Sequence, residues 1–135
     1  MNDSSVVLIG KVVSDIRYVQ SQDGHGNARF RILVKERRFD RTTNRFVDAE
    51  PSFFTVLSWR QLADNVKASV RKGDPVVVSG RLRVREWQAD DGSHGAIAEI
   101  SANSVGHDLA RGQSHFDRRS NGGVAGISRA GSDAA

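Results

Sequence analysis

Arginine recurs at every second position between residues 81 and 85 of this 135-residue chain, and a tryptophan continues the series. The residues of this parity are Arg81, Arg83, Arg85 and Trp87. Alternate side chains of a β-strand point to the same face, so the guanidinium groups and the indole would form one strip. Such a strip can bind phosphates and stack a base. It can equally be a solvated basic face with Trp87 at its rim, and this strand alone does not decide between the two.

Three other aromatic residues bear on that choice. Phe53 and Trp59 are six positions apart and would share one face of a strand, where packing in the core is the simpler interpretation. Phe39 favours binding instead, because its parity places it on the charged side of a basic strand. Three arginines flank it, namely Arg37, Arg38 and Arg41. Packing explains an aromatic side chain on a cationic face poorly.

Positive charge is concentrated around Phe39. The whole chain has a net charge of +4, yet residues 29–45 alone carry seven basic and two acidic residues. The basic residues that we expect to contact a nucleic-acid backbone here are Arg29, Arg31, Lys35, Arg37, Arg38 and Arg41. A cationic groove can follow the backbone, while stacking accepts any base at roughly 1–3 kcal/mol per base. The pattern therefore predicts sequence-tolerant binding of a single-stranded nucleic acid.

The elements that must position these residues are mostly strands. Apolar alternation predicts five of them, over residues 6–13, 29–39, 53–59, 76–87 and 96–100. The first is an apolar run that we expect to be buried, with Gly10 at a bulge or a close backbone approach. In the second, Phe30, Ile32 and Val34 would face the core. Turn-forming residues at 23–27, 42–44 and 90–92 predict hairpins.

One segment has the periodicity of a helix. Leu62, Val66 and Val70 are four positions apart, which predicts a helix over residues 60–72 that Gly73 ends. The expected order is thus three strands, one helix and two strands. This order predicts an all-β fold with one helix, the OB-fold, a five-stranded Greek-key barrel with its helix between strands three and four.

The composition changes near residue 110. Residues 111–135 contain five glycines and four serines but few apolar residues. Such a segment cannot bury enough apolar surface to offset the entropy lost on ordering. We therefore expect an OB-fold domain for binding a single-stranded nucleic acid over residues 1–110, followed by a disordered tail containing Gly, Ser and Arg over residues 111–135.

Several chemical classes are disfavoured. The chain has no cysteine, and none of its four histidines has a partner at metal-ligand spacing. We expect no metal, no cofactor and no enzymatic activity. No apolar run approaches the roughly 20 residues of a membrane span, and the first residues lack the basic flank of a signal peptide. We expect a cytoplasmic, nucleoid-associated protein without a membrane partner.

The chain resembles the bacterial single-stranded DNA-binding proteins. The matching segments within about residues 5–110 are Val7–Lys11, Phe53–Trp59, Val70–Gly73 and Val76–Trp87. The resemblance implies four stacking residues, Phe39, Phe53, Trp59 and Trp87. It also implies a homotetramer wrapped by single-stranded DNA, in support of DNA replication, recombination, repair or chromosome segregation.

The chain departs from that family in several places. Members often carry Trp at the places of Phe39 and Phe53, and Phe at that of Trp59. Phe54 stands where many members have a histidine at a subunit contact. The chain ends in Ser132-Asp133-Ala134-Ala135, whereas tailed members end in an acidic tip that docks replication and repair enzymes. The chain is therefore similar to shorter paralogues of the family. Replication and repair proteins are candidate partners, although the docking tip is missing.

Two other functions fit the same residues. Single-stranded RNA offers the same bases and phosphates, and no sequence pattern shows a contact that selects deoxyribose. An OB-fold protein–protein adaptor would use its basic strands only for steering or assembly.

Overall fold

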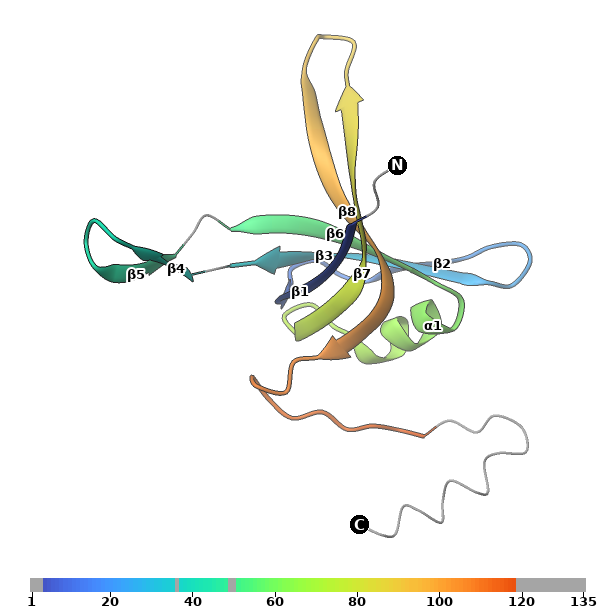
Figure 1. The fold of residues 1–135 in the computed structure, drawn as a ribbon. Helices are drawn as coiled ribbons and strands as arrows, with labels where there is room; N and C mark the ends of the chain where they lie inside the picture. Colours follow the sequence, from blue (N-terminus) through green and yellow to red (C-terminus); the bar gives the residue numbers. More distant parts are fainter. Residues whose placement is uncertain (1–3, 36, 49–50, 119–135) are drawn as a thin grey trace.

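The computed structural model describes residues 4–35, 37–48 and 51–118 (Figure 1). In this part of the chain the elements are β1 (Ser4–Val12), β2 (Arg17–Gln20), β3 (Gly26–Val34), β4 (Arg37–Asp40), β5 (Arg45–Asp48), β6 (Ser52–Trp59), α1 (Arg60–Ser69), β7 (Pro75–Gln88) and β8 (His94–His107). Residues 108–118 form neither helix nor strand. The rest of the predicted tail, residues 119–135, lies outside the described residues.

Six strands form one sheet in the order β1-β7-β8-β6-β3-β2, and a second pairing between β1 and β3 closes five of them into a ring. β1 pairs with β7 along most of its length and meets β3 at Lys11 and Val12. β1 and β3 approach closely at Gly10, where a Cβ atom would lie 2.6 Å from the Leu33 carbonyl oxygen. The predicted OB-fold, mostly β with one helix, is confirmed.

The core lies inside the ring. Phe30, Ile32 and Val34 of β3 are buried, as their alternation predicts. Val12, Val56, Val76, Val78 and Ile100 from the other strands complete this cluster. α1 adds Ala63 and Val66 and packs against β3, β6 and β8. No helix in the described part of the chain is long and apolar enough to cross a membrane.

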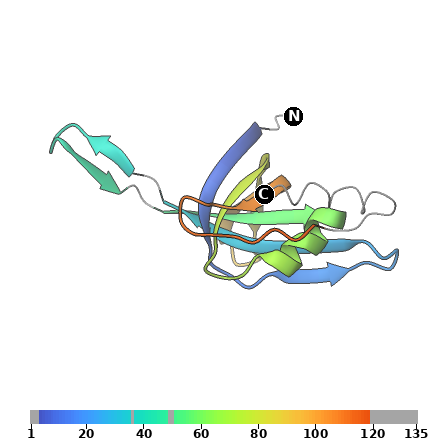
Figure 2. The same ribbon diagram turned by 90° about the horizontal axis from the view of Figure 1, so that it is seen from below.

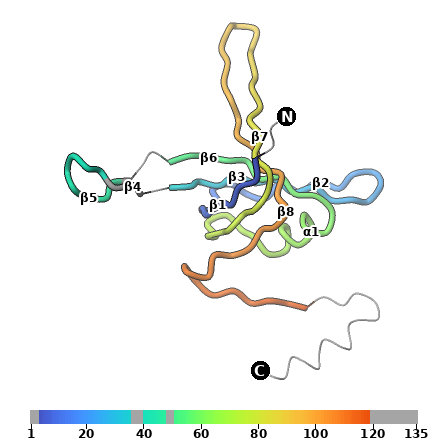
Figure 3. Tube along the Cα trace, viewed as in Figure 1, coloured from blue at the N-terminus to red at the C-terminus, as the bar shows by residue number. Residues whose placement is uncertain are grey.

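Two hairpins extend away from the ring. β4 and β5 form a separate two-stranded sheet, and the ends of β7 and β8 project as an arm (Figures 1 and 3). Seen from below, the β4–β5 hairpin again lies well away from the ring (Figure 2). The hairpin turns predicted at 42–44 and 90–92 lie between paired strands. The turn predicted at 23–27 is shorter, because Gly26 and Asn27 already pair within β3.

The predicted element boundaries need three corrections. The strand predicted over residues 29–39 is two strands, β3 and β4, in different sheets. The helix ends at Ser69 rather than Lys72, because Val70 is already extended, and Gly73 with φ +98° belongs to the next turn. β8 continues to His107, seven residues beyond the predicted end, since pairing with β7 across a bulge at Ser79 and Gly80 supports its weakly apolar second half.

β2, which the sequence pattern does not predict, is held to α1 by one side chain. The Tyr18 hydroxyl donates a hydrogen bond to the Asp64 carboxylate, and Lys67 Nζ lies 4.6 Å from the centre of the tyrosine ring. Gly26 lies beneath this pair, where a Cβ atom would be 2.2 Å from the Tyr18 hydroxyl oxygen. The hydrogen bond to Asp64, followed by desolvation and the Asp64 charge, raises the pKa of Tyr18.

The raised pKa predicts how stability depends on pH. The phenol favours the folded state while it is protonated, so its contribution is complete below the unfolded pKa and is lost as pH rises through the higher folded pKa. Tyr18→Phe should lower the free energy of unfolding at pH 7, and this difference from the unmodified protein should shrink in strongly alkaline solution. Tyr18 is the only tyrosine, so no second phenol titrates. Urea unfolding at both pH values measures the difference, and one that stays constant with pH contradicts the assignment.

Candidate nucleic-acid interface

Register places the aromatic residues of β6 on the outside of the ring. Phe30 of β3 is the cross-strand partner of Val56, and both are buried. Phe53 and Trp59 have the opposite parity to Val56, so they point outward and are 48% and 45% exposed. The simpler interpretation of these two residues as core is therefore wrong.

The same face continues through β8 to β7. Thr55 of β6 is the cross-strand neighbour of Glu99, and Glu99 is in turn the partner of Arg83. Cross-strand partners share a face, so the arginine series joins the face that carries Phe53 and Trp59. We call this surface the outer face. The residues that define it are Asn27, Arg29, Arg31, Phe53, Leu57, Trp59, Arg81, Arg83, Arg85 and Trp87.

Two arginines on β3 combine charge with apolar surface. The Arg31 guanidinium lies 5.0 Å from the centre of the Phe53 ring, a cation–π contact that keeps the charge beside a potential stacking surface. Arg29 is directly opposite Arg17 of β2, which sequence analysis missed because it did not predict β2. Like charges in this arrangement repel, and a bound phosphate would relieve the repulsion. These arginines line a hollow of about 420 Å³.

The indole of Trp87 packs against the backbone of a glycine on the neighbouring strand. Its cross-strand partner is Gly95, where a Cβ atom would lie 2.7 Å from Cζ2 of the indole. The indole is 47% exposed on the projecting arm. A flat aromatic ring with one face toward solvent can stack a base.

Arg85 differs from the other arginines in its series. Its Nη2 atom lies 3.0 Å from Oε2 of Glu99, whose side chain is only 14% exposed. A largely buried carboxylate needs a compensating charge, which Arg85 supplies. A phosphate would have to compete with Glu99 for this guanidinium, so Arg85 is less available to an anion than its position suggests.

The structure places the remaining predicted residues away from the outer face. Arg37, Arg38 and Phe39 lie in β4, and Arg41 lies in the turn to β5. The side chains of the three β4 residues are outside the described part of the structure.

Phe46 of β5, which sequence analysis missed, is 61% exposed and is the cross-strand partner of Phe39. A Phe opposite Phe39 across the predicted turn is the signal that could have found it. Lys35 follows β3 and borders a different surface.

That surface is a groove beside β1, whose walls combine apolar residues with charged ones such as Asp108 and Arg111. The sequence predicts β1 to be buried, but Val7 and Ile9 are 66% and 57% exposed, because alternate residues of this strand face out of the ring. With Leu33, Lys35 and Pro75 they line a groove of about 720 Å³. Phe54 lies on the opposite side of the sheet and packs against the core cluster.

The chain is similar to known single-stranded DNA-binding proteins. Residues 3–108 match the single-strand binding protein family. Single-stranded DNA-binding protein 2 of Streptomyces avermitilis is 45% identical over 131 residues, which cover 96% of this chain and 82% of that protein.

Solved structures resemble the fold as well. The crystal structure of the small single-stranded DNA-binding protein from Streptomyces coelicolor has a TM-score of 0.72 at 40% identity, over 83% of this chain and all of that one. The Plasmodium falciparum SSB complex with ssDNA has a TM-score of 0.62 at 26% identity, over 78% of this chain and 96% of that one.

The contact between Trp87 and Gly95 can be tested by fluorescence. In a Trp59→Phe background Trp87 is the only tryptophan. Adding Gly95→Ala should displace the indole and shift its emission, because the new methyl group would overlap the ring. Gly106→Ala is the matched control on the same strand, since nothing lies within 4 Å of a Cβ atom there. Equal emission from the two variants would contradict the described position of the indole.

Proposed function

The chain belongs to the single-strand binding protein family, and we propose that it binds single-stranded DNA on the outer face by stacking bases on aromatic rings while arginines neutralise the backbone. One observation carries this proposal: Phe53, Trp59 and Trp87 are each nearly half exposed on a face that also carries arginines. Exposed aromatic surface next to cationic groups is what an unpaired strand requires. The proposed activity is binding, without a catalytic step.

Within this proposal the residues have distinct roles. Phe53, Trp59 and Trp87 stack bases on the outer face, and Phe39 does so on the β4–β5 hairpin. The residues that contact phosphates are Arg29, Arg31, Lys35, Arg37, Arg38, Arg41, Arg81, Arg83 and Arg85. Among them Arg85 contributes least, because Glu99 already occupies its guanidinium. Residues 1–110 suffice for this activity, and the segment 111–135 is a tail outside the DNA-binding domain.

The proposed cellular setting follows from the ligand. Single-stranded DNA is exposed during replication, recombination and repair, so the protein acts on the nucleoid. Stacking does not depend on base identity, and the binding is therefore sequence-tolerant.

We also propose that the protein self-associates through β1, as a homotetramer. Val7 and Ile9 expose apolar surface in the single chain, beside a groove that Leu33 and Pro75 extend. Contiguous exposed apolar surface marks contact sites for other chains. A second copy of the same strand is the occupant that the family resemblance favours.

Titration with oligo-dT tests the binding proposal. Binding should quench tryptophan fluorescence, and the affinity should fall with salt at a slope of about −0.7 per neutralised phosphate. Trp87→Ala should weaken binding by about 1–3 kcal/mol. Val84→Ala is the matched control, because Val84 is an exposed residue on the other face of the same arm.

Several results would count against this mode of binding. A flat salt titration without quenching would refute it, and equal affinities for the Trp87 and Val84 variants would remove Trp87 from the stacking surface. Tighter binding of oligo-rU than of oligo-dT would indicate an RNA-binding protein instead.

Light scattering tests self-association. The unmodified protein should have four times the monomer mass of 14.8 kDa. Val7→Asp combined with Ile9→Asp should reduce that mass without unfolding the domain, because both side chains are exposed in the single chain. Val19→Asp, at an exposed apolar position on β2, should leave the mass unchanged. A monomeric unmodified protein, or a double variant with the original mass, contradicts the proposal.

A further inference from the structure

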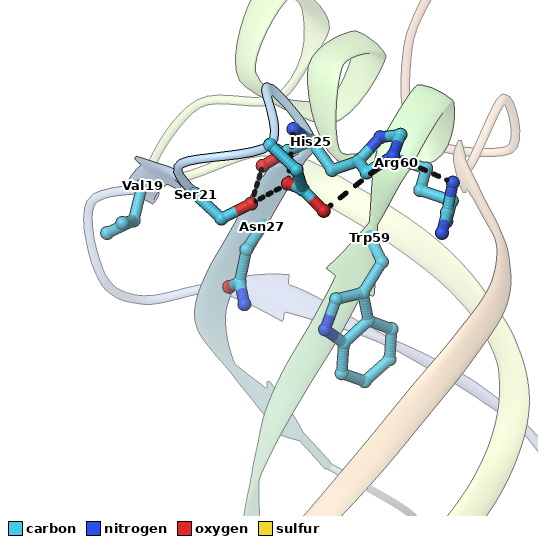
Figure 4. Close-up of a pocket in the computed structure, with 8 residues that line it drawn as sticks. Val19, Ser21, His25, Asn27, Trp59 and Arg60 are labelled. Atoms are coloured by element: carbon cyan, nitrogen blue, oxygen red, sulfur yellow. Dashed lines mark hydrogen bonds and ion pairs between the residues drawn. The ribbon is translucent and has the colours of Figure 1, made fainter.

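A second hollow adjoins Trp59, between the β2–β3 turn and the start of α1. Its volume is about 330 Å³, and its walls include Val19, Asn27, Trp59 and Arg60 (Figure 4). In Figure 4 the side chains of Asn27 and Trp59 project to the same side, and His25 and Arg60 lie at the rim. The hollow thus combines an aromatic wall with polar groups that no other part of the proposed binding mode uses.

Arg60 is held in an uncommon conformation. It directly follows Trp59, and its φ of +56° lies in the left-handed region that residues other than glycine rarely adopt. Its Nη1 atom lies 3.2 Å from Nε2 of His25, which accepts a hydrogen bond from it. Strained backbone of this kind persists only where the surroundings fix it, and it is concentrated at binding sites. The arrangement directs the guanidinium toward the turn.

The turn that holds His25 is itself well fixed. The His25 carbonyl oxygen accepts a hydrogen bond from the amide of Ser21 at 2.8 Å, and the Ser21 hydroxyl donates to Asp23 Oδ1. The His25 amide donates to Asp23 Oδ1 at 3.1 Å. His25 therefore offers a fixed acceptor to Arg60, whose guanidinium has five N–H donors in all. The donors that His25 does not use are available to an anion.

Asn27 lies on the outer face as the cross-strand partner of Trp59. Its side chain is exposed, and its carboxamide has no hydrogen-bond partner within the described segments. A carboxamide offers both donors and an acceptor, which can pair with the edge of a base.

One carboxylate opposes an anion here. Asp23 Oδ2 lies 3.9 Å from His25 Nε2. Hydrogen bonds from the Ser21 hydroxyl and the His25 amide lower the pKa of Asp23, so it is ionised at neutral pH. Its negative charge should weaken any phosphate contact at Arg60. Removing the Asp23 charge should therefore tighten binding, whereas removing the Arg60 charge should weaken it.

We propose that this hollow binds one nucleotide of single-stranded DNA, next to the one stacked on Trp59. Arg60 pairs with its phosphate, Asn27 donates to or accepts from its base edge, and His25 is a positioning residue for Arg60. The inference rests on the proposed function and extends the path of the strand from the outer face onto the β2–β3 turn.

The experiment uses the full chain with Trp87→Phe as the reference protein, so that Trp59 is the only tryptophan and reports stacking at that site. Oligo-dT is titrated at several salt concentrations, with inorganic phosphate as a competitor in a parallel series. Arg60→Gln should weaken binding about tenfold at low salt and reduce the salt slope by about 0.7, the value for one phosphate. Quenching at saturation should persist, because Trp59 still stacks.

The control matches the charge change. Arg71→Gln removes the same charge just beyond the last residue of α1, at an exposed position, and should leave the salt slope unchanged.

Asp23→Asn should tighten binding, since it removes the opposing charge and keeps a side-chain oxygen for the turn. Asn27→Ala should weaken binding several-fold without changing the salt slope. His25→Ala should weaken binding of oligo-dT, because Arg60 loses the acceptor that positions it. His25→Gln, which restores an acceptor, should restore the affinity.

A folding control keeps the result unambiguous. Arg60→Gly removes the guanidinium and suits a positive φ, so the protein should stay folded yet lose the same affinity as Arg60→Gln. Affinities and slopes for both Arg60 variants equal to those of Arg71→Gln would overturn the inference while the proposed function stands. Competition by millimolar inorganic phosphate would show a site for free anions rather than for the strand. A reference protein that does not bind oligo-dT would refute the proposed function and this inference together.

Discussion

A closed ring of strands has one interior, and that constraint determines where every second side chain lies. β3 and β6 meet through partners such as Phe30 and Val56, which fill the interior. Their neighbours of opposite parity must then point out of the ring, whatever their type. The half-exposed Phe53 and Trp59 therefore need an explanation other than packing, and a ligand with flat apolar faces and a charged backbone supplies one.

The outer face is shaped to keep its aromatic rings available. The Trp87 indole lies over Gly95, where any side chain would displace it. Arg31 lies over Phe53 and adds charge without covering it fully, since the ring stays 48% exposed. Arg60 takes a left-handed φ beside Trp59 and is held by His25. Small local costs of this kind are usual at binding surfaces, where the bound partner offsets them.

Period-two alternation was enough to predict the buried side of β3 and the arginine series of β7, because local geometry decides which way those residues point. It failed where distant segments decide. Alternation could not show that Val7 and Ile9 face solvent, since that depends on which strands flank β1. It missed β2, which pairs with β3 and is tied to α1 by the hydrogen bond from Tyr18 to Asp64, 46 positions away. It also missed Arg60 with His25, which only the folded turn brings together.

In the proposed mode of binding, one strand of DNA crosses the outer face. A crystal structure of the full chain with oligo-dT tests it most directly. Thymine rings should be stacked on Phe53, Trp59 and Trp87, with phosphates beside Arg29, Arg31 and Arg83. A strand that instead runs along the β1 groove or over α1, and leaves these three rings without a base, would contradict it.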